Sequence, residues 1–316
     1  MQIKKPDFWD LKKPNFLSIL LLPFTIILLI NNFFLSRKSQ KINKKIKTIC
    51  IGNIYIGGTG KTPTTIKIYD LLKKSDFNVC SAKKIYLSHI DEIKILEKKT
   101  NLIKGKNRKQ IIDKAINENY DCLIFDDGLQ DKNVSYNLQF VCFNTNNWIG
   151  NSQLLPAGPL REKVTSLKKY DAVFLKKNNG AEENIEKIIK EYNPKIEIFN
   201  TEYVVKNFNK FDLSKKYLFF CGIGNPNNFK NTLLRYKFNI IDEIIFPDHF
   251  DYKEKDIKNI KDRARKNNAC IITTEKDYVK ISQTDSDNID FLDIDLKIED
   301  EDKLIKFINS KLNEEY

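Results

Sequence analysis

Residues 57–62 have the composition of a loop that binds phosphate groups. The run consists of Gly57, Gly58, Thr59, Gly60, Lys61 and Thr62. An apolar run at residues 49–51 precedes it, and Pro63 with a helical stretch follows. Glycines let successive backbone N–H groups face one phosphate, and the start of a helix adds partial positive charge. We therefore expect nucleotide phosphates here, with Lys61 at the β- and γ-phosphates and the Thr62 hydroxyl on Mg²⁺.

The match to the common pattern G-x-x-x-x-G-K-[ST] is incomplete, because Tyr55 stands at its first position. A glycine-rich turn that binds no nucleotide is therefore the alternative. The apolar strand before the loop and the helix after it favour the nucleotide site.

Asp126 and Asp127 directly follow the apolar residues 123–125. A phosphate loop needs an acidic side chain at the end of a neighbouring strand to hold the magnesium ion and its waters. Adjacent acids before a glycine also occur in plain turns, so the upstream loop decides the interpretation. We expect Thr62, Asp126 and Asp127 to bind Mg²⁺.

Four further clusters carry candidate site residues, at residues 154–162, 222–226, 246–249 and 273–277. The first is a Pro/Gly loop that presents Arg161, a residue type suited to a phosphate or to charge developing on a phosphoryl group. The others each follow an apolar run, where open α/β sheets place their sites. Any one of them alone is more typical of a turn.

The elements that position these residues alternate between short strands and helices. Strands are expected at residues 49–51, 122–125, 138–143, 172–175, 217–221, 240–245, 269–272 and 291–294. Helices are expected at residues 63–74, 109–119, 182–191, 227–237, 253–267 and 302–312. The alternation predicts an α/β fold of parallel sheets covered by helices. We expect a P-loop NTPase-like kinase domain at residues 46–206 and a smaller α/β domain at residues 207–316.

Residues 1–45 are expected to form a membrane-anchor helix and its basic flank. Phe16–Leu35 carries no charge and has roughly the length that spans a bilayer core. Pro23, Asn31 and Asn32 weaken it, so a helix in the membrane interface and a buried helix are the alternatives. Basic residues without acids follow it up to residue 47, which by the positive-inside rule places the next domain in the cytoplasm.

The net charge of +12 fits an anionic lipid or a phosphorylated substrate as partner. A nucleic-acid partner is not expected, because we find no reading motif and no basic residues interleaved with aromatics. None of the six cysteines forms a C-x-x-C pair, which favours core positions in a reducing compartment.

Six motifs together closely resemble those of the tetraacyldisaccharide 4'-kinase family, the lipid A 4'-kinases. In chain order they are residues 52–63, 126–130, 155–162, 222–226, 247–249 and 274–277. The resemblance covers nearly the whole chain. It implies ATP- and Mg²⁺-dependent phosphorylation of the 4'-hydroxyl of a lipid A disaccharide 1-phosphate, at the cytoplasmic face of a bacterial inner membrane with anionic lipids. It also implies two α/β/α domains with the active site between them.

The resemblance assigns roles to single residues. Asp91 and Glu92 are similar to the family's Gly-Asp-Glu motif, whose aspartate is the proposed base, and His249 is similar to its partner histidine. A base suits phosphoryl transfer because the attacking hydroxyl must lose its proton. Glu92 is expected beside the metal. The residues expected at the substrate are Gln130, Arg161 and Glu162. Because Asp91 and His249 fall in different predicted domains, domain closure is expected to bring them together.

The sequence departs from the family pattern in one region. Residues 81–84 read Ser-Ala-Lys-Lys where the family has Ser-Arg-Gly-Tyr, and the segment from there to Asp91 is shortened. Ile90 replaces the motif glycine, and Asp131 stands where a histidine often follows the glutamine. Capping of a helix at residues 93–98 is therefore the alternative role for Asp91.

Two other functions are compatible with a phosphate loop. A membrane-associated ATPase or GTPase switch has no lipid acceptor, and it would need neither the Arg161 loop nor His249. A degenerate protein without activity would explain the shortened segment, but the chain retains Lys61, Asp126 and Asp127. A lipid-substrate kinase is the function that we expect.

Substituting Lys61 by alanine should lower turnover by about 10²–10³-fold, because an electrostatic contact to the transferred phosphate is lost. The fold should persist, since Lys61 is expected to contact phosphate and not the core. Steady-state phosphoryl transfer and circular dichroism check the two halves of this prediction. Near-normal turnover of a folded Lys61→Ala protein would remove the phosphate loop from the mechanism.

Overall fold

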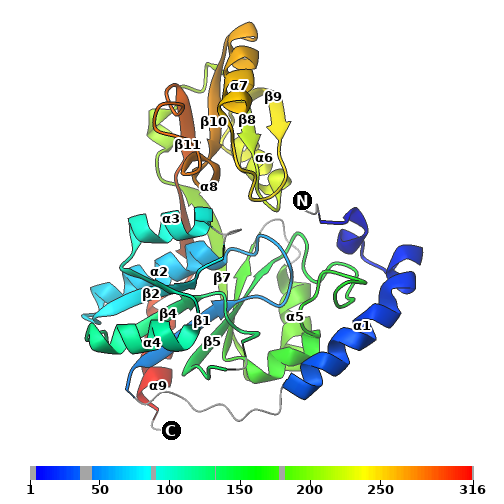
Figure 1. The fold of residues 1–316 in the computed structure, drawn as a ribbon, viewed down its shortest axis with the longest axis vertical. Helices are drawn as coiled ribbons and strands as arrows, with labels where there is room; N and C mark the ends of the chain where they lie inside the picture. The colour runs from blue at the N-terminus through cyan, green and yellow to red at the C-terminus, as the bar shows by residue number, and fades with distance from the viewer. Residues whose placement is uncertain (1–4, 36–44, 87–89, 132, 178–181, 315–316) are drawn as a thin grey trace. The chain divides into compact units, whose positions relative to one another are not determined.

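The structure, a computed structural model, describes residues 5–35, 45–86, 90–131, 133–177 and 182–314. Contacts divide the chain into two compact units (Figure 1). The larger unit comprises Lys5–Ile85, Lys99–Glu202 and Leu296–Tyr316. The smaller unit is made up mainly of Tyr86–Lys98 and Tyr203–Asp295.

The larger unit is built on an eight-stranded sheet with the order β12-β7-β6-β5-β1-β4-β2-β3. The strands are β1 (Lys47–Gly52), β2 (Val79–Lys84), β3 (Leu102–Gly105), β4 (Cys122–Asp126), β5 (Leu138–Asn144), β6 (Ala172–Lys176), β7 (Glu197–Val205) and β12 (Ile294–Ile298). The central strand β1 is parallel to both β4 and β5. Ile51 lies opposite Asp126, so the parallel register brings the start of the phosphate loop beside the acidic pair.

Helices cover both faces of this sheet. The helices of the larger unit are η1 (Asp7–Asp10), α1 (Phe16–Leu35), α2 (Lys61–Lys74), α4 (Arg108–Asn117), η3 (Val164–Lys169), α5 (Glu182–Tyr192) and α9 (Glu301–Asn313). Successive strand residues face opposite sides. Cys50 therefore joins a core with α4 and α5, whereas Ile49 and Ile51 join a core with α2 and α9. The result is a three-layer α/β/α arrangement around β1.

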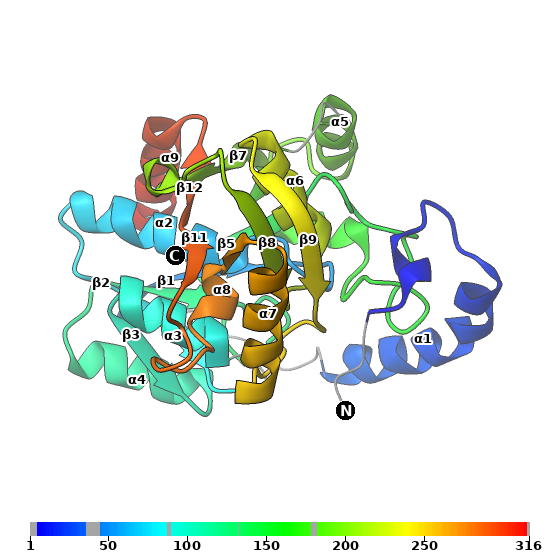
Figure 2. The same ribbon diagram turned by 90° about the horizontal axis from the view of Figure 1, so that it is seen from above.

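The smaller unit has a four-stranded parallel sheet with the order β11-β10-β8-β9. Its elements are α3 (Ile90–Lys99), η4 (Phe208–Lys210), β8 (Lys216–Cys221), α6 (Pro226–Arg235), β9 (Asn239–Ile245), α7 (Glu254–Lys266), β10 (Ala269–Thr274), α8 (Glu275–Tyr278) and β11 (Ile289–Leu292). Phe219 packs with α6 and Phe220 packs with α7, so these helices cover opposite faces (Figures 1 and 2).

The α/β class with mostly parallel sheets is confirmed, but the contacts divide the chain differently from the predicted boundaries. Helix α9 belongs to the larger unit, because Leu304, Ile308 and Leu312 are buried in the core that contains Phe140. Residues 86–98 belong to the smaller unit, although the sequence assigns them to the first domain.

Phe16–Leu35 is helical, as predicted. In the part of the chain that the structure describes, no helix is long and apolar enough to cross a membrane.

Candidate active site

The phosphate loop runs from β1 into α2, which begins at Lys61. Two of its glycines take backbone angles that other residues rarely adopt, with φ 126° at Gly57 and 93° at Gly60. The buried Asn53 side chain donates a hydrogen bond to Thr59 Oγ1 at 2.9 Å. The loop is thus braced from within, and its lysine and second threonine lie in the first turn of α2.

Asp127 lies between two cations. Lys61 Nζ is 3.6 Å from Asp127 Oδ2, and an Arg161 N–H group is 3.1 Å from each carboxylate oxygen. Burial alone would raise the pKa of Asp127, but Lys61, Arg161 and Lys83 outweigh it and hold that pKa well below its usual range. Asp127 is therefore ionised at neutral pH and fixes both cations at the end of β4.

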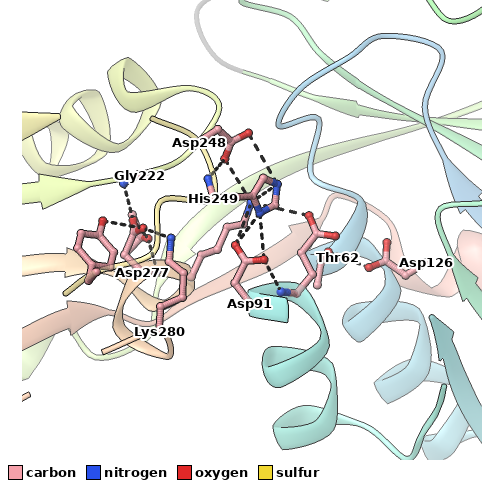
Figure 3. A network of polar contacts seen from close by, with 12 residues as sticks. Thr62, Asp91, Asp126, Gly222, Asp248, His249, Asp277 and Lys280 are labelled. Carbon is pink, nitrogen blue, oxygen red and sulfur yellow. Dashed lines mark hydrogen bonds and ion pairs between the residues drawn. The ribbon is translucent and has the colours of Figure 1, made fainter. Parts of the chain in front are cut away.

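One carboxylate oxygen of Asp126 accepts hydrogen bonds from a hydroxyl group and from an ammonium group. The Thr62 hydroxyl donates to Asp126 Oδ2 at 2.9 Å (Figure 3), so two of the residues predicted at the metal lie side by side. Lys83 Nζ donates to the same oxygen at 2.8 Å, and both side chains are buried. Sequence reasoning treated Lys83 only as a departure from a family motif. Its signal was a lysine within a strand, where burial requires a charged partner.

The end of β4 suits a nucleotide-bound Mg²⁺. Asp126 Oδ1 is buried and has no hydrogen-bond partner among the described residues. With the Thr62 hydroxyl it supplies hard oxygen donors, and Mg²⁺ sites at phosphates use few protein ligands because phosphates and waters complete them. Among the described residues, no group of three or more His, Cys, Asp or Glu side chains is placed so that it could hold a metal ion by itself. Glu92, also predicted beside the metal, belongs to the smaller unit, and its metal role stays a prediction.

The three residues predicted at the substrate lie together in the larger unit. Gln130 Nε2 donates to Glu162 Oε1 at 2.9 Å, and Arg161 donates to Gln130 Oε1 at 3.2 Å. All three border a pocket of about 390 Å³, which Lys163 and Leu29 of α1 also line. Basic, acidic and apolar side chains all line the pocket.

Asp91 and His249 are in contact (Figure 3). His249 Nδ1 lies 3.0 Å from both carboxylate oxygens of Asp91. Lys276 Nζ lies 3.4 Å from Asp91 Oδ2, 3.5 Å from Asp248 Oδ1, 3.8 Å from Glu92 Oε1 and 3.4 Å from His249 Nε2. An ammonium group can only donate, so His249 Nε2 accepts and Nδ1–H donates to Asp91.

The charges around Asp91 keep it ionised. Burial raises the pKa of Asp91, but the hydrogen bond from His249 and the charge of Lys276 outweigh it, and the pKa is lowered. Burial lowers the pKa of Lys276, but Asp248, Glu92 and Asp91 outweigh it, and that pKa is raised. Lys276 lies in a motif that the sequence singled out, at residues 273–277, but no role was assigned to it.

Two expectations about Asp91 are wrong. Asp91 and His249 do not come from different domains, because residues 86–98 belong to the smaller unit together with His249. Asp91 does not cap a helix over residues 93–98, because α3 already begins at Ile90 and places Asp91 in its first turn. The shortened segment before α3 includes residues 87–89, which lie outside the described residues.

A buried carboxylate, Asp277, joins the three motifs of the smaller unit (Figure 3). It accepts hydrogen bonds from Gly222 N at 3.0 Å, Tyr252 Oη at 2.9 Å and Thr274 Oγ1 at 2.7 Å. The Gly222 carbonyl in turn accepts the backbone N–H of His249 at 3.1 Å. The spacing of the motifs did not reveal this connection, since the three segments meet only through the parallel strands.

Replacing Asp91 by asparagine should lower the single-turnover rate by about 10²-fold or more, because a general base contributes on that scale. His249→Ala should also slow the reaction, and the double variant should be little slower than Asp91→Asn alone, since the pair acts as a unit. Rapid-quench measurements on the three variants check this, with the exposed Asp262→Asn as control. Small effects that multiply strictly would contradict a functional pair.

Comparison with known proteins identifies the family of this chain. A model of the family described as tetraacyldisaccharide-1-P 4'-kinase matches residues 15–89 and 88–313. A tetraacyldisaccharide 4'-kinase of Pelagibacter ubique is 46% identical, with 99% of each chain covered. One of Rickettsia africae is 34% identical, with 97% of this chain and 98% of the relative covered.

A similar fold is known from a crystal structure of LpxK from Aquifex aeolicus in complex with ATP. The TM-score is 0.67 at 22% identity, with 94% of this chain and 99% of that chain covered. The family match and the full-length relatives extend over both units and over every motif described above. This chain belongs to the tetraacyldisaccharide 4'-kinase family.

Proposed function

We propose that the protein transfers the γ-phosphoryl group of Mg²⁺-bound ATP to the 4'-hydroxyl of a tetraacyldisaccharide 1-phosphate. The observation that carries the proposal is the phosphate loop of a family member with Lys61 beside Asp127 and Thr62 bonded to Asp126. Lys61 and the loop N–H groups bind the phosphates. When bound, Mg²⁺ supplies positive charge to the phosphate oxygens, and Thr62 and Asp126 are the residues that would hold it.

Asp91 is the base in this proposal. The hydroxyl proton passes to the Asp91 carboxylate while the hydroxyl oxygen bonds to the γ-phosphorus and the bond to ADP breaks. Because the pKa of Asp91 is lowered, the carboxylate is ionised at neutral pH, which is the form that a base needs before the proton is transferred. His249 and Lys276 hold the carboxylate in one orientation by contacts to its two oxygens.

A nucleotide switch without a lipid acceptor is not favoured. It would leave the buried Asp91 and its two basic partners without a role, and buried ionic groups of this kind are seldom kept for stability alone. The pocket beside Arg161 would also lack a ligand.

We further propose that α1 attaches the protein to the anionic cytoplasmic face of the bacterial inner membrane. Two polar residues of α1 face the protein: Ser18 Oγ donates to Ala157 O at 2.7 Å and Thr25 Oγ1 to Leu154 O at 3.3 Å. Its apolar residues face outward, with Phe16, Leu20 and Ile27 exposed by 76, 59 and 63%. This reverses the usual amphipathic pattern and suits a helix that lies in a lipid interface.

The transfer reaction is tested with purified full-length protein, γ-labelled ATP, MgCl₂ and tetraacyldisaccharide 1-phosphate in detergent. The expected product is a doubly phosphorylated lipid, and Lys61→Ala serves as the inactive reference. Hydrolysis of ATP that does not change when the lipid is added would contradict the proposal and support the switch.

Attachment by α1 predicts that Leu20→Glu with Ile27→Glu weakens vesicle binding by at least about tenfold, because two exposed apolar side chains lose their contact with lipid. Flotation with vesicles of phosphatidylethanolamine and phosphatidylglycerol measures this. Leu234→Glu is the matched control, since Leu234 is 51% exposed on α6 of the smaller unit. Equal binding of all variants would show that another surface holds the membrane.

A further inference from the structure

A polar cluster lies around the buried side chain of Tyr55, the residue that replaces the first glycine of the phosphate-loop pattern. Tyr55 is 3% exposed, and its hydroxyl donates to the Asp10 carboxylate of η1. Asn147 Nδ2 donates to the Tyr55 hydroxyl at 3.2 Å and to Asp10 Oδ1 at 3.0 Å. Lys5 contacts both Asp10 and the Tyr55 hydroxyl, with its ammonium group 4.7 Å from the ring centroid. The phenol therefore uses its single donor on Asp10.

The ring of Tyr55 lies beside the phosphate loop. A Cβ atom built on Gly57 would lie 3.5 Å from Tyr55 Cε1, so the ring borders the space that a side chain at Gly57 would occupy. Gly57 has a φ of 126°, and its carbonyl accepts the N–H of Thr59 at 2.9 Å. Tyr55 is two residues before Gly57 in the chain, so a displaced Tyr55 would move the backbone that leads into the N–H groups of the loop.

Asp10 is itself held in place by contacts on η1 that do not involve α1. Trp9 Nε1 donates to Pro156 O at 3.1 Å, and Asn151 N donates to Trp9 O at 3.0 Å. A side chain at Gly150 could not coexist with this contact, because its Cβ would be 2.2 Å from Trp9 O. The short helix is thus fixed on the loop at residues 147–161, and Asp10 points from it to Tyr55.

The protonation states suit a charge-assisted hydrogen bond. Burial would raise the pKa of Asp10, but hydrogen bonds from Lys5, Tyr55 and Asn147 outweigh it, and the pKa is lowered. Burial and the neighbouring Asp10 both raise the pKa of Tyr55. The carboxylate is charged and the phenol neutral across the physiological pH range, and such a bond is stronger than one between two neutral groups.

We propose that Asp10 is a positioning residue for the nucleotide: through Tyr55 it fixes the backbone at Gly57 in the conformation that binds phosphate. The segment before α1 then contributes to ATP binding as well as leading to the helix that attaches the protein to lipid. This inference rests on the proposed ATP site at residues 57–62 and is independent of the lipid acceptor.

The test is the dissociation constant of Mg²⁺-bound ADP, measured by titration calorimetry on full-length variants without lipid. Asp10→Asn and Tyr55→Phe should each raise it about threefold to tenfold, as expected for the partial loss of one charge-assisted hydrogen bond. The double variant should bind no more weakly than the weaker single variant, because both remove the same contact. Asp7→Asn on the same short helix is the matched control and should bind as the wild type does.

A purely structural role would lower the melting temperature of Tyr55→Phe and leave the dissociation constant of the folded protein unchanged. That result overturns the proposal. A double variant whose dissociation constant rises by the product of the two single-variant increases also overturns it. The Lys61→Ala variant distinguishes a failure of the proposed ATP site from a failure of the proposed role of Asp10. If Lys61→Ala binds ADP normally, the ATP site itself is wrong; if it loses binding while Asp10→Asn and Tyr55→Phe keep it, only the role of Asp10 fails.

Discussion

The phosphate-loop site depends on one constraint. Two adjacent carboxylates, Asp126 and Asp127, stand at the end of β4. Two adjacent anions repel each other, and here one is buried and the other partly buried, so their stability requires the cations and the hydroxyl that converge on them. Lys83 and Thr62 converge on Asp126, and Lys61 and Arg161 converge on Asp127. The loop, the neighbouring strand β2 and the Arg161 loop are thereby tied to one point of the sheet.

The phosphate-loop site could be predicted because the sequence patterns that indicate it lie close together in the chain. A strand, a glycine-rich turn and a helix follow one another within about one supersecondary unit, and a second strand supplies the acids. Strand β2 was not among the predicted strands, because Ser81 and Lys83 interrupt its apolar pattern. Both are nevertheless buried, since Ser81 pairs with Thr100 and Lys83 pairs with Asp126.

The contacts of Asp91 could not be predicted from spacing. The order of elements in the sequence predicted that Asp91 lies in the first domain. In the structure, residues 86–98 make their contacts within the smaller unit. Likewise, α9 follows the second domain in sequence and completes the core of the first. Sequence patterns indicate which face of an element is buried, whereas the partner of that face depends on contacts far apart in the chain.

The membership of Asp91 and His249 in one unit changes how the base is prepared. His249 has a φ of 57°, a conformation that is uncommon for residues other than glycine and costs of order 1 kcal/mol or more. The hydrogen bond from its backbone to Gly222, and the bond from Gly222 to the buried Asp277, offset that cost and fix the histidine. The carboxylate that we propose as the base is therefore oriented by contacts within the smaller unit, and in that proposal binding energy from the substrates is not needed to assemble the pair.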